Sequence, residues 1–215
     1  HSIEENSLFK VKKNYTCIKD DSFKSKKLNS KFYSFIYSLS SHKDIKKKLN
    51  FLKIKYSDAS HICYAYRLFN GFTLLNEINT NDFSTDAGEP RGSSGPPILK
   101  ILKRHNMVNV VVFVIRYFGG TKLGIPGLIE AYSESTEGLI KKENIKLWFP
   151  TKIVELEYPY NIEKPLSNLF KKFNVKINSQ NYYNSIHCVI ELNIIDIDTF
   201  LNALTSFPSC SIKKT

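Results

Sequence analysis

Two glycine-rich segments carry the residues of this chain that are best suited to chemistry. The first runs from Asp86 to Leu99 and the second from Val110 to Gly124, and together they hold six of the nine glycines. Each places cationic or hydroxyl side chains beside accessible backbone N–H groups, a combination that suits phosphate and other anions. The expected anion or nucleic-acid contacts are Arg67, Arg91, Ser93, Ser94, Arg116, Gly119, Gly120, Lys122 and Gly124.

A structural role is the alternative for the same segments. Arg116 shares a strand face with Val114, and its guanidinium can grip a phosphate or carboxylate, or pair internally with Glu89 or Asp86. Carboxylates in glycine turns commonly accept backbone N–H bonds, and Gly119-Gly120 also suits a turn that needs positive φ. The residues to which we assign a loop-structuring role are Asp86, Gly88, Glu89, Pro90, Gly95 and Gly127.

The familiar catalytic motifs do not fit these segments. Gly119-x4-Gly124 has the glycine spacing of a P-loop, but Ile125-Pro126 stands where Lys and Ser/Thr are required. Ser93 and Ser94 lack the G-x-S-x-G elbow and an assignable base. We therefore expect no catalytic residues, no metal site and no cofactor. A hydrolase or transferase that uses these serines with Asp86 and Glu89 remains an alternative.

The cysteines and the hydropathy pattern indicate a cytoplasmic protein. The four cysteines are widely separated, without a C-x-x-C pair, which favours reduced, mostly buried thiols over disulfides or a zinc site. The longest apolar run, Val110 to Ile115, is a strand's length, whereas a membrane-spanning helix needs ~20 residues. The first residues show no apolar signal core.

Net charge is +11 and lies almost wholly in the first part of the chain. Residues 1–150 carry 24 Lys and Arg against 14 Asp and Glu, and the remaining 65 residues carry 7 against 6. A basic body favours polyanions through counterion release and long-range steering. The alternative is codon bias, because the chain has 27 Lys but only 4 Arg.

Periodicity predicts mixed strands and helices in the first part. Strands are expected at 15–27, 31–39, 60–69 and 108–118, the last buried on both faces because it is apolar throughout. Helices are expected at 42–55, with Ser41 and Asp44 as its capping pair, from Pro96-Pro97 onward, and at 127–142. The stretch 70–97 is expected to be irregular, and 144–151 to be a connection in which Pro150 marks the boundary.

The last part has a regular order of short elements. Strands are expected at 152–158, 175–181, 185–194 and 210–213, and helices at 161–173 and 196–207. The order β-α-β-β-α-β is that of the ferredoxin-like fold. The sequence therefore predicts two α+β domains, at 1–148 and 149–215.

Several motifs in the first part resemble the YigZ/IMPACT family. They are Ser30-Lys-Phe32, Asp58-Ala-Ser-His-Ile-Cys-Tyr-Ala-Tyr-Arg67, the D-x-G-E-P-x-G-x-x-G-x-P-I-L segment at 86–99, Val111-Val-Phe-Val-Ile-Arg-Tyr-Phe-Gly-Gly-Thr-Lys-Leu-Gly124 and Gly127-Leu-Ile-Glu-Ala-Tyr132. The last part is similar to the second domain of the bacterial, two-domain YigZ-like branch.

This resemblance implies a ribosomal protein S5 domain 2-like first domain, a small ferredoxin-like second domain and a link to the regulation of translation. It implies no established catalytic residues. We therefore expect a non-enzymatic, cytoplasmic regulator that binds nucleic acid, as RNA or the ribosome, through its basic first domain. A module that binds a protein partner through its second domain is a further alternative.

Overall fold

Strand β6 (Val110–Tyr117) is the central strand of a five-stranded antiparallel sheet. Its residues from Val110 to Arg116 are all buried, as expected for a strand covered on both faces. The sheet order is β2-β3-β6-β4-β5. The other strands are β2 (Asp21–Lys27), β3 (Ser30–Ser38), β4 (His61–Phe72) and β5 (Ile78–Thr85).

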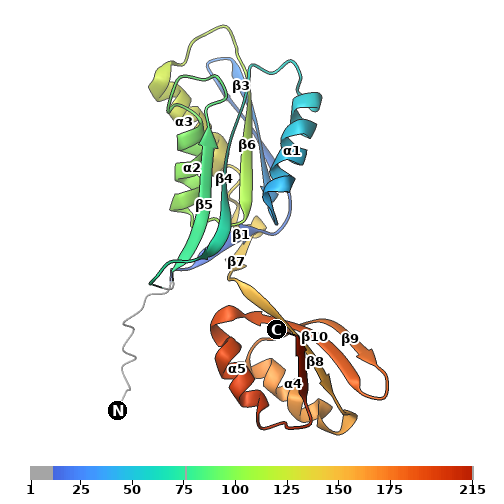
Figure 1. Ribbon diagram of the computed structural model, residues 1–215. Coiled ribbons are helices and arrows are strands. Elements are labelled where there is room, and N and C mark those ends of the chain that lie inside the picture. Colours follow the sequence, from blue (N-terminus) through green and yellow to red (C-terminus); the bar gives the residue numbers. More distant parts are fainter. Residues whose placement is uncertain (1–11, 76, 215) are drawn as a thin grey trace. The chain divides into compact units, whose positions relative to one another are not determined.

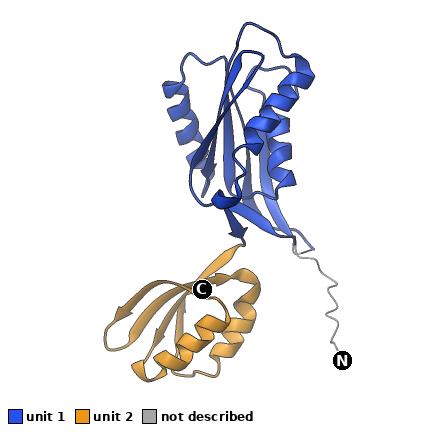
Figure 2. Ribbon diagram, turned by 180° about the vertical axis from the view of Figure 1, so that it is seen from behind, with its two compact units in different colours: residues 1–148 blue, residues 149–215 orange. Residues whose placement is uncertain are grey.

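The computed structural model describes residues 12–75 and 77–214. The chain divides between Trp148 and Phe149 into two units, coloured separately in Figure 2. The protein therefore has a mixed α/β fold in two parts. No helix in the described residues combines the length and apolar character needed to cross a membrane.

Helices cover both faces of the large sheet. Helix α1 (His42–Lys55) lies on one face, and α2 (Gly95–Arg104) and α3 (Gly124–Glu137) lie on the other (Figure 1). Alternate residues of β6 therefore enter two separate cores. Val112 packs with residues of α2 and α3, and Phe113 packs on the α1 side.

The limits of α1 confirm the prediction for residues 42–55. Ser41 and Asp44 form a capping box, and Asp44 Oδ2 accepts hydrogen bonds from the backbone N–H groups of Ser40 and Ser41, both at 3.0 Å. Ile45 and Leu52 are its buried residues. Most of the lysines lie on the exposed side of the helix, which also carries Phe51 and Ile54, as expected when one apolar stripe packs on the sheet.

Several predictions in the first part need correction. Residues 15–27 form two strands, β1 (Asn14–Cys17) and β2, rather than one. The connection predicted at 144–151 begins at the last residue of a short helix (Lys142–Asn144). It contains β7 (Ile145–Trp148), which pairs antiparallel with β1, and the start of β8. Helix α3 spans Gly124–Glu137 rather than 127–142. It begins before Gly127 because Pro126 fits within a first helical turn, and it ends before Lys142, which belongs to the short helix that follows.

The irregular stretch predicted at 70–97 contains β5. Among residues 12–75 and 77–214 this strand pairs with β4 alone, and it forms one edge of the sheet. Its sequence, INTNDFST, has the polar residues of an exposed edge in place of an apolar alternation. The polar composition that suggested a loop is therefore that of an edge strand, whose outer side faces solvent.

The second unit has the predicted element order β-α-β-β-α-β. Its elements are β8 (Thr151–Tyr158), α4 (Glu163–Lys172), β9 (Lys176–Tyr182), β10 (Ile186–Asn193), α5 (Ile197–Leu204) and β11 (Ser211–Lys214), with short helices at Tyr160–Ile162 and Ile194–Asp196. The four strands form an antiparallel sheet in the order β11-β8-β10-β9. Its core includes Leu156, Phe170 and Phe200.

Candidate functional site

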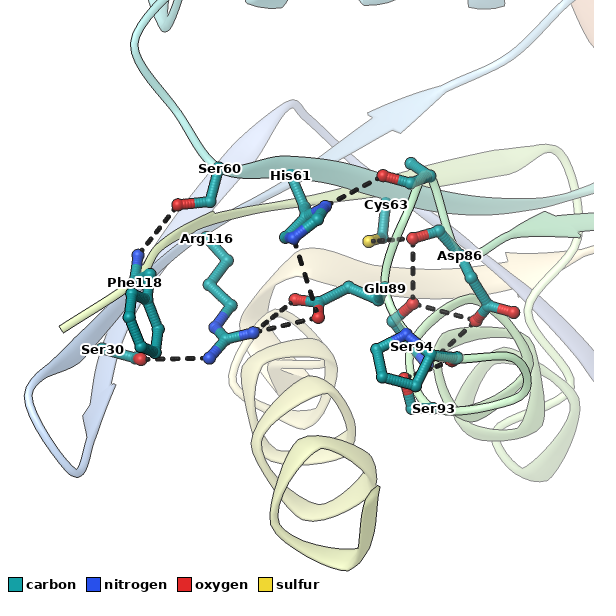
Figure 3. Close-up of polar contacts among 12 residues, drawn as sticks. Ser30, Ser60, His61, Cys63, Asp86, Glu89, Ser93, Ser94, Arg116 and Phe118 are labelled. Atoms are coloured by element: carbon teal, nitrogen blue, oxygen red, sulfur yellow. Dashed lines mark hydrogen bonds and ion pairs between the residues drawn. The ribbon is translucent and has the colours of Figure 1, made fainter. Parts of the chain in front are cut away.

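The two glycine-rich segments meet at one end of the large sheet, around a cavity of about 440 Å³. Strand β4 contributes His61, β6 contributes Arg116, and the loop before α2 contributes Glu89 (Figure 3). The complete lining is His61, Glu89, Pro90, Arg116, Phe118, Lys122, Leu123, Gly124, Ile125 and Leu128. We call this space the glycine-loop cavity.

A buried ion pair closes the floor of the glycine-loop cavity. Nη1 of Arg116 donates to both carboxylate oxygens of Glu89, at 2.7 and 2.9 Å. The hydroxyl of Tyr132, on α3, donates to the same carboxylate at 2.8 Å. The Arg116 and Glu89 side chains are only 7% and 2% exposed. Of the two pairings weighed from the sequence, the structure therefore shows the one with Glu89.

The other two nitrogens of the Arg116 guanidinium, Nη2 and Nε, have a long hydrogen bond and none, respectively. Nη2 reaches the Ser30 hydroxyl at 3.4 Å (Figure 3), and the ring of Phe118 lies 5.5 Å from the guanidinium carbon. Nε is buried and has no hydrogen-bond partner among the described residues. A buried donor without a partner is costly, so this atom marks a place where water or a ligand oxygen would be stabilised.

Asp86 organises the first loop and the start of α2. Its Oδ1 accepts from the N–H groups of Ser94 and Gly95, at 3.1 and 2.9 Å, and its Oδ2 accepts from the N–H of Gly92 at 2.8 Å. Burial raises the pKa of the Asp86 carboxyl, but these hydrogen bonds outweigh burial and hold it below its ordinary value. Asp86 therefore ties the first loop to the first turn of α2.

Ser93 and Ser94 are fully buried, which corrects their assignment as anion contacts. The Ser93 hydroxyl donates to the carbonyl oxygen of Pro90 at 2.6 Å, and the Ser94 hydroxyl donates to Asp86 Oδ1 at 2.9 Å. A hydroxyl in such a position cannot reach an external phosphate or attack a substrate. The structure therefore also removes the basis for using these serines as nucleophiles.

Arg67 and Arg116 are likewise occupied by internal partners. Arg67 donates to Asp82 Oδ1, to the carbonyl oxygen of Met107 and to the Thr80 hydroxyl, each at 3.1 Å. Arg116 is held by Glu89. The expectation that these two guanidinium groups contact an anion directly is corrected because each already has a carboxylate partner.

The other residues expected to contact an anion are two exposed side chains and three loop glycines. Arg91 and Lys122 are exposed and form no ion pair among the described residues. Gly120 and Gly124 have positive φ, +87° and +71°. Gly119 approaches the backbone of Asn29 so closely that a Cβ would overlap it. The second loop therefore needs its glycines for conformation and packing, whether or not it binds a ligand.

Conformation and packing also account for the glycines of the first loop and for Gly127 in α3. Gly88 has φ +90° and lies against the ring of His61, and a Cβ on Gly95 would come within 2.6 Å of the Thr85 backbone. Glu89 and Pro90 line the glycine-loop cavity. A Cβ on Gly127 would lie 3.1 Å from that of Leu123.

Two partners of this network carried no local signal in the sequence. The Cys63 thiol donates to the Asp86 carbonyl oxygen at 3.0 Å (Figure 3) and to the Tyr132 hydroxyl at 3.4 Å. Burial raises the pKa of Cys63 to about 11, so the thiol stays protonated at neutral pH. Both residues come from elements whose apolar periodicity indicates only a core position.

A second candidate surface lies on α1. Its exposed lysines, which we call the α1 lysine face, are Lys43, Lys46, Lys47, Lys53 and Lys55. None of them lies within ion-pair distance of a carboxylate in the described residues, whereas Lys48 pairs with Asp20. None of these lysines is among the anion contacts expected from the sequence, which all lie at Arg67 or in the glycine-rich segments.

Aromatic side chains adjoin the α1 lysine face. Lys55 Nζ lies 5.6 Å from the centre of the Tyr56 ring, and Tyr56 stacks on Tyr33 with ring centres 6.0 Å apart. A cavity of about 350 Å³ opens there. Its lining is Asn29, Lys31, Tyr33, Tyr56, Asp58, Tyr117 and Phe118.

These features define a two-part α/β protein with a basic helix face and a closed glycine-loop ion pair. The Impact N-terminal domain model matches residues 28–140. Because the match covers more than half of the chain, the protein belongs to the IMPACT family.

Two curated relatives agree with this assignment. The chain is 34% identical to the IMPACT family member YvyE of Bacillus subtilis over 51% of this chain and 48% of that protein. It is 24% identical to the IMPACT family member YigZ of Escherichia coli over 75% of this chain and 77% of that protein. The first curated relatives are matched over only about half to three fifths of their own lengths. A crystal structure described as a hypothetical protein has the same fold, with a TM-score of 0.60, 20% identity, and coverage of 93% of this chain and 96% of that one.

Proposed function

We propose that this protein is a cytoplasmic, translation-linked regulator that binds RNA, free or within the ribosome, through the α1 lysine face. The family membership supports the link to translation, and the charge of the first unit supports a polyanionic partner. We also propose the finer fold assignments: an S5 domain 2-like first unit and a ferredoxin-like second unit. The strand order β11-β8-β10-β9 supports the latter.

The observation that carries this proposal is the state of the lysines on α1. Five are exposed, and none has a carboxylate partner among the described residues. The only acidic residue in the helix, Asp44, is engaged in the capping box. The positive charge of this face therefore remains available to an outside anion, unlike that of Arg67 and Arg116.

The neighbouring aromatic cavity favours a single strand over a duplex. Lysines follow a phosphate backbone without regard to sequence, and exposed aromatic rings stack on unpaired bases. Tyr33 and Phe118 line the cavity, and the Phe118 side chain is half exposed. Asp58, the acidic residue in that lining, accepts a hydrogen bond from the Tyr117 hydroxyl at 2.7 Å.

Fluorescence anisotropy with a labelled single-stranded RNA tests the proposal. The triple variant Lys43→Gln/Lys46→Gln/Lys47→Gln is compared with Lys100→Gln/Lys142→Gln/Lys146→Gln, which removes equal charge from exposed positions elsewhere in the first unit. We expect the α1 variant to weaken binding by about tenfold or more and the control to weaken it much less. Equal losses would indicate a diffuse basic surface and contradict the proposal, as would absence of binding at low salt.

A further inference from the structure

The glycine-loop cavity shares no residue with the α1 lysine face, and only Phe118 lines both this cavity and the aromatic cavity beside that face. Its volume of about 440 Å³ lies within the range of small-molecule pockets, which are mainly apolar with a few polar groups. Half of its lining residues are apolar side chains or proline: Pro90, Phe118, Leu123, Ile125 and Leu128.

The charges in the lining leave a single positive group without a carboxylate partner. Arg116 and Glu89 neutralise one another on the floor. Lys122, at the exposed edge, forms no ion pair among the described residues. The cavity therefore presents one uncompensated cation beside an apolar wall.

Two sets of hydrogen-bond donors at the cavity also lack partners. The Nε of Arg116, in a side chain that is 7% exposed, has none in the described part of the chain. Helix α3 begins at the cavity with Gly124, and its N-cap residue Leu123 provides no side-chain cap and its first turn no acidic residue. The positive end of a helix and an unpartnered buried donor both stabilise an oxygen anion.

We propose that the glycine-loop cavity binds a small monocarboxylate with an apolar body. The carboxylate lies between the Lys122 ammonium and the first turn of α3, and the apolar body lies against Leu123, Ile125 and Leu128. A single negative charge matches the one free ammonium. A phosphate dianion would bring a second charge into a largely apolar cavity without a cation to compensate it.

Amide NMR titration of the full chain with hexanoate tests this site. We expect saturable shifts at Gly119, Gly120 and Gly124 with a Kd of about 1 mM. Hexanamide, which has the same shape without the charge, is expected to bind at least several-fold more weakly. Saturable shifts of these amides with inorganic phosphate but not with hexanoate would overturn the assignment to a carboxylate. Absence of saturable shifts with either anion would overturn the site.

Variants separate this site from the RNA surface. Lys122→Gln is expected to weaken hexanoate binding about fivefold to tenfold, and Lys142→Gln, an exposed lysine elsewhere, is the matched control. Ile125→Ser tests the apolar wall and is also expected to weaken binding. The α1 triple variant is expected to bind hexanoate normally, so failure of the RNA proposal leaves this result unaffected. Equal affinity in Lys122→Gln and Lys142→Gln would overturn the proposal.

Discussion

Arg116 and Glu89 are 27 residues apart in the chain and form a buried ion pair with an Nη1–Oε1 distance of 2.7 Å. The pair joins the end of the central strand to the loop that precedes α2. It holds the two glycine-rich segments together. Because Glu89 neutralises the Arg116 guanidinium, that charge is not available to an external anion.

Loss of this ion pair is expected to destabilise the first unit strongly. Glu89→Ala leaves the Arg116 guanidinium buried without its counter-charge, and breaking a buried pair in this way costs about 3–5 kcal/mol. Urea unfolding measures the change in the free energy of unfolding. Glu130→Ala removes an exposed partner of Lys27 and is the control with little expected effect. Equal losses in the two variants would contradict a special role for the buried pair.

The stability of the first loop is expected to depend on pH through Asp86. Hydrogen bonds hold its pKa below the ordinary value in the folded protein despite burial, so the unfolded chain binds this proton more tightly. The stabilisation is therefore complete above the unfolded pKa of about 3.9 and is lost as pH falls through the folded-state pKa.

Asp86→Asn removes that dependence. The free energies of unfolding of wild type and Asp86→Asn are expected to differ most near neutral pH and to converge as pH falls from about 5 toward 2. Chemical unfolding at several pH values measures this. Glu143→Gln, at an exposed acid, controls for general charge effects. A constant difference across the range would show that the carboxylate charge is not responsible.

The second glycine loop is expected to tolerate a side chain poorly at one position. A Cβ on Gly119 would overlap the backbone of Asn29 and Ser30, and overpacking of this kind costs about 3 kcal/mol. Gly120→Ala meets no neighbouring atom but keeps a φ of +87°, a strain of about 1–2 kcal/mol. Thermal or urea unfolding should therefore rank Gly119→Ala as the less stable variant. The reverse order would argue against close packing of this loop on β3.

RNA binding through the α1 lysine face predicts a specific salt dependence. Five lysines that each neutralise one phosphate of a single strand give a slope of log K against log salt of about −3.5. The Lys43→Gln/Lys46→Gln/Lys47→Gln variant should reduce the magnitude of the slope by about 2. Anisotropy titrations at four or more salt concentrations measure both values. An unchanged slope in the variant would place the phosphate contacts elsewhere.

The amino-acid sequence alone determined the elements whose signals are local. Helix α1 follows from an apolar stripe together with Ser41 and Asp44, and β6 follows from an uninterrupted apolar run. The second unit has the predicted order of elements because each is a short amphipathic segment between turn residues. Patterns of this kind depend on near neighbours, so they can be interpreted without knowledge of the tertiary structure.

Tertiary structure decided which charges remain available. The composition of β5 is that of a loop, and only pairing with β4 makes it a strand. Arg67 and Arg116 have the residue type of anion contacts, but Asp82 and Glu89 occupy them. The five lysines of the α1 lysine face stay free of ion pairs because no carboxylate within the described residues lies within reach of them, whereas Lys48 of the same helix pairs with Asp20. Whether a charge is compensated depends on partners distant in the chain, which local sequence does not specify.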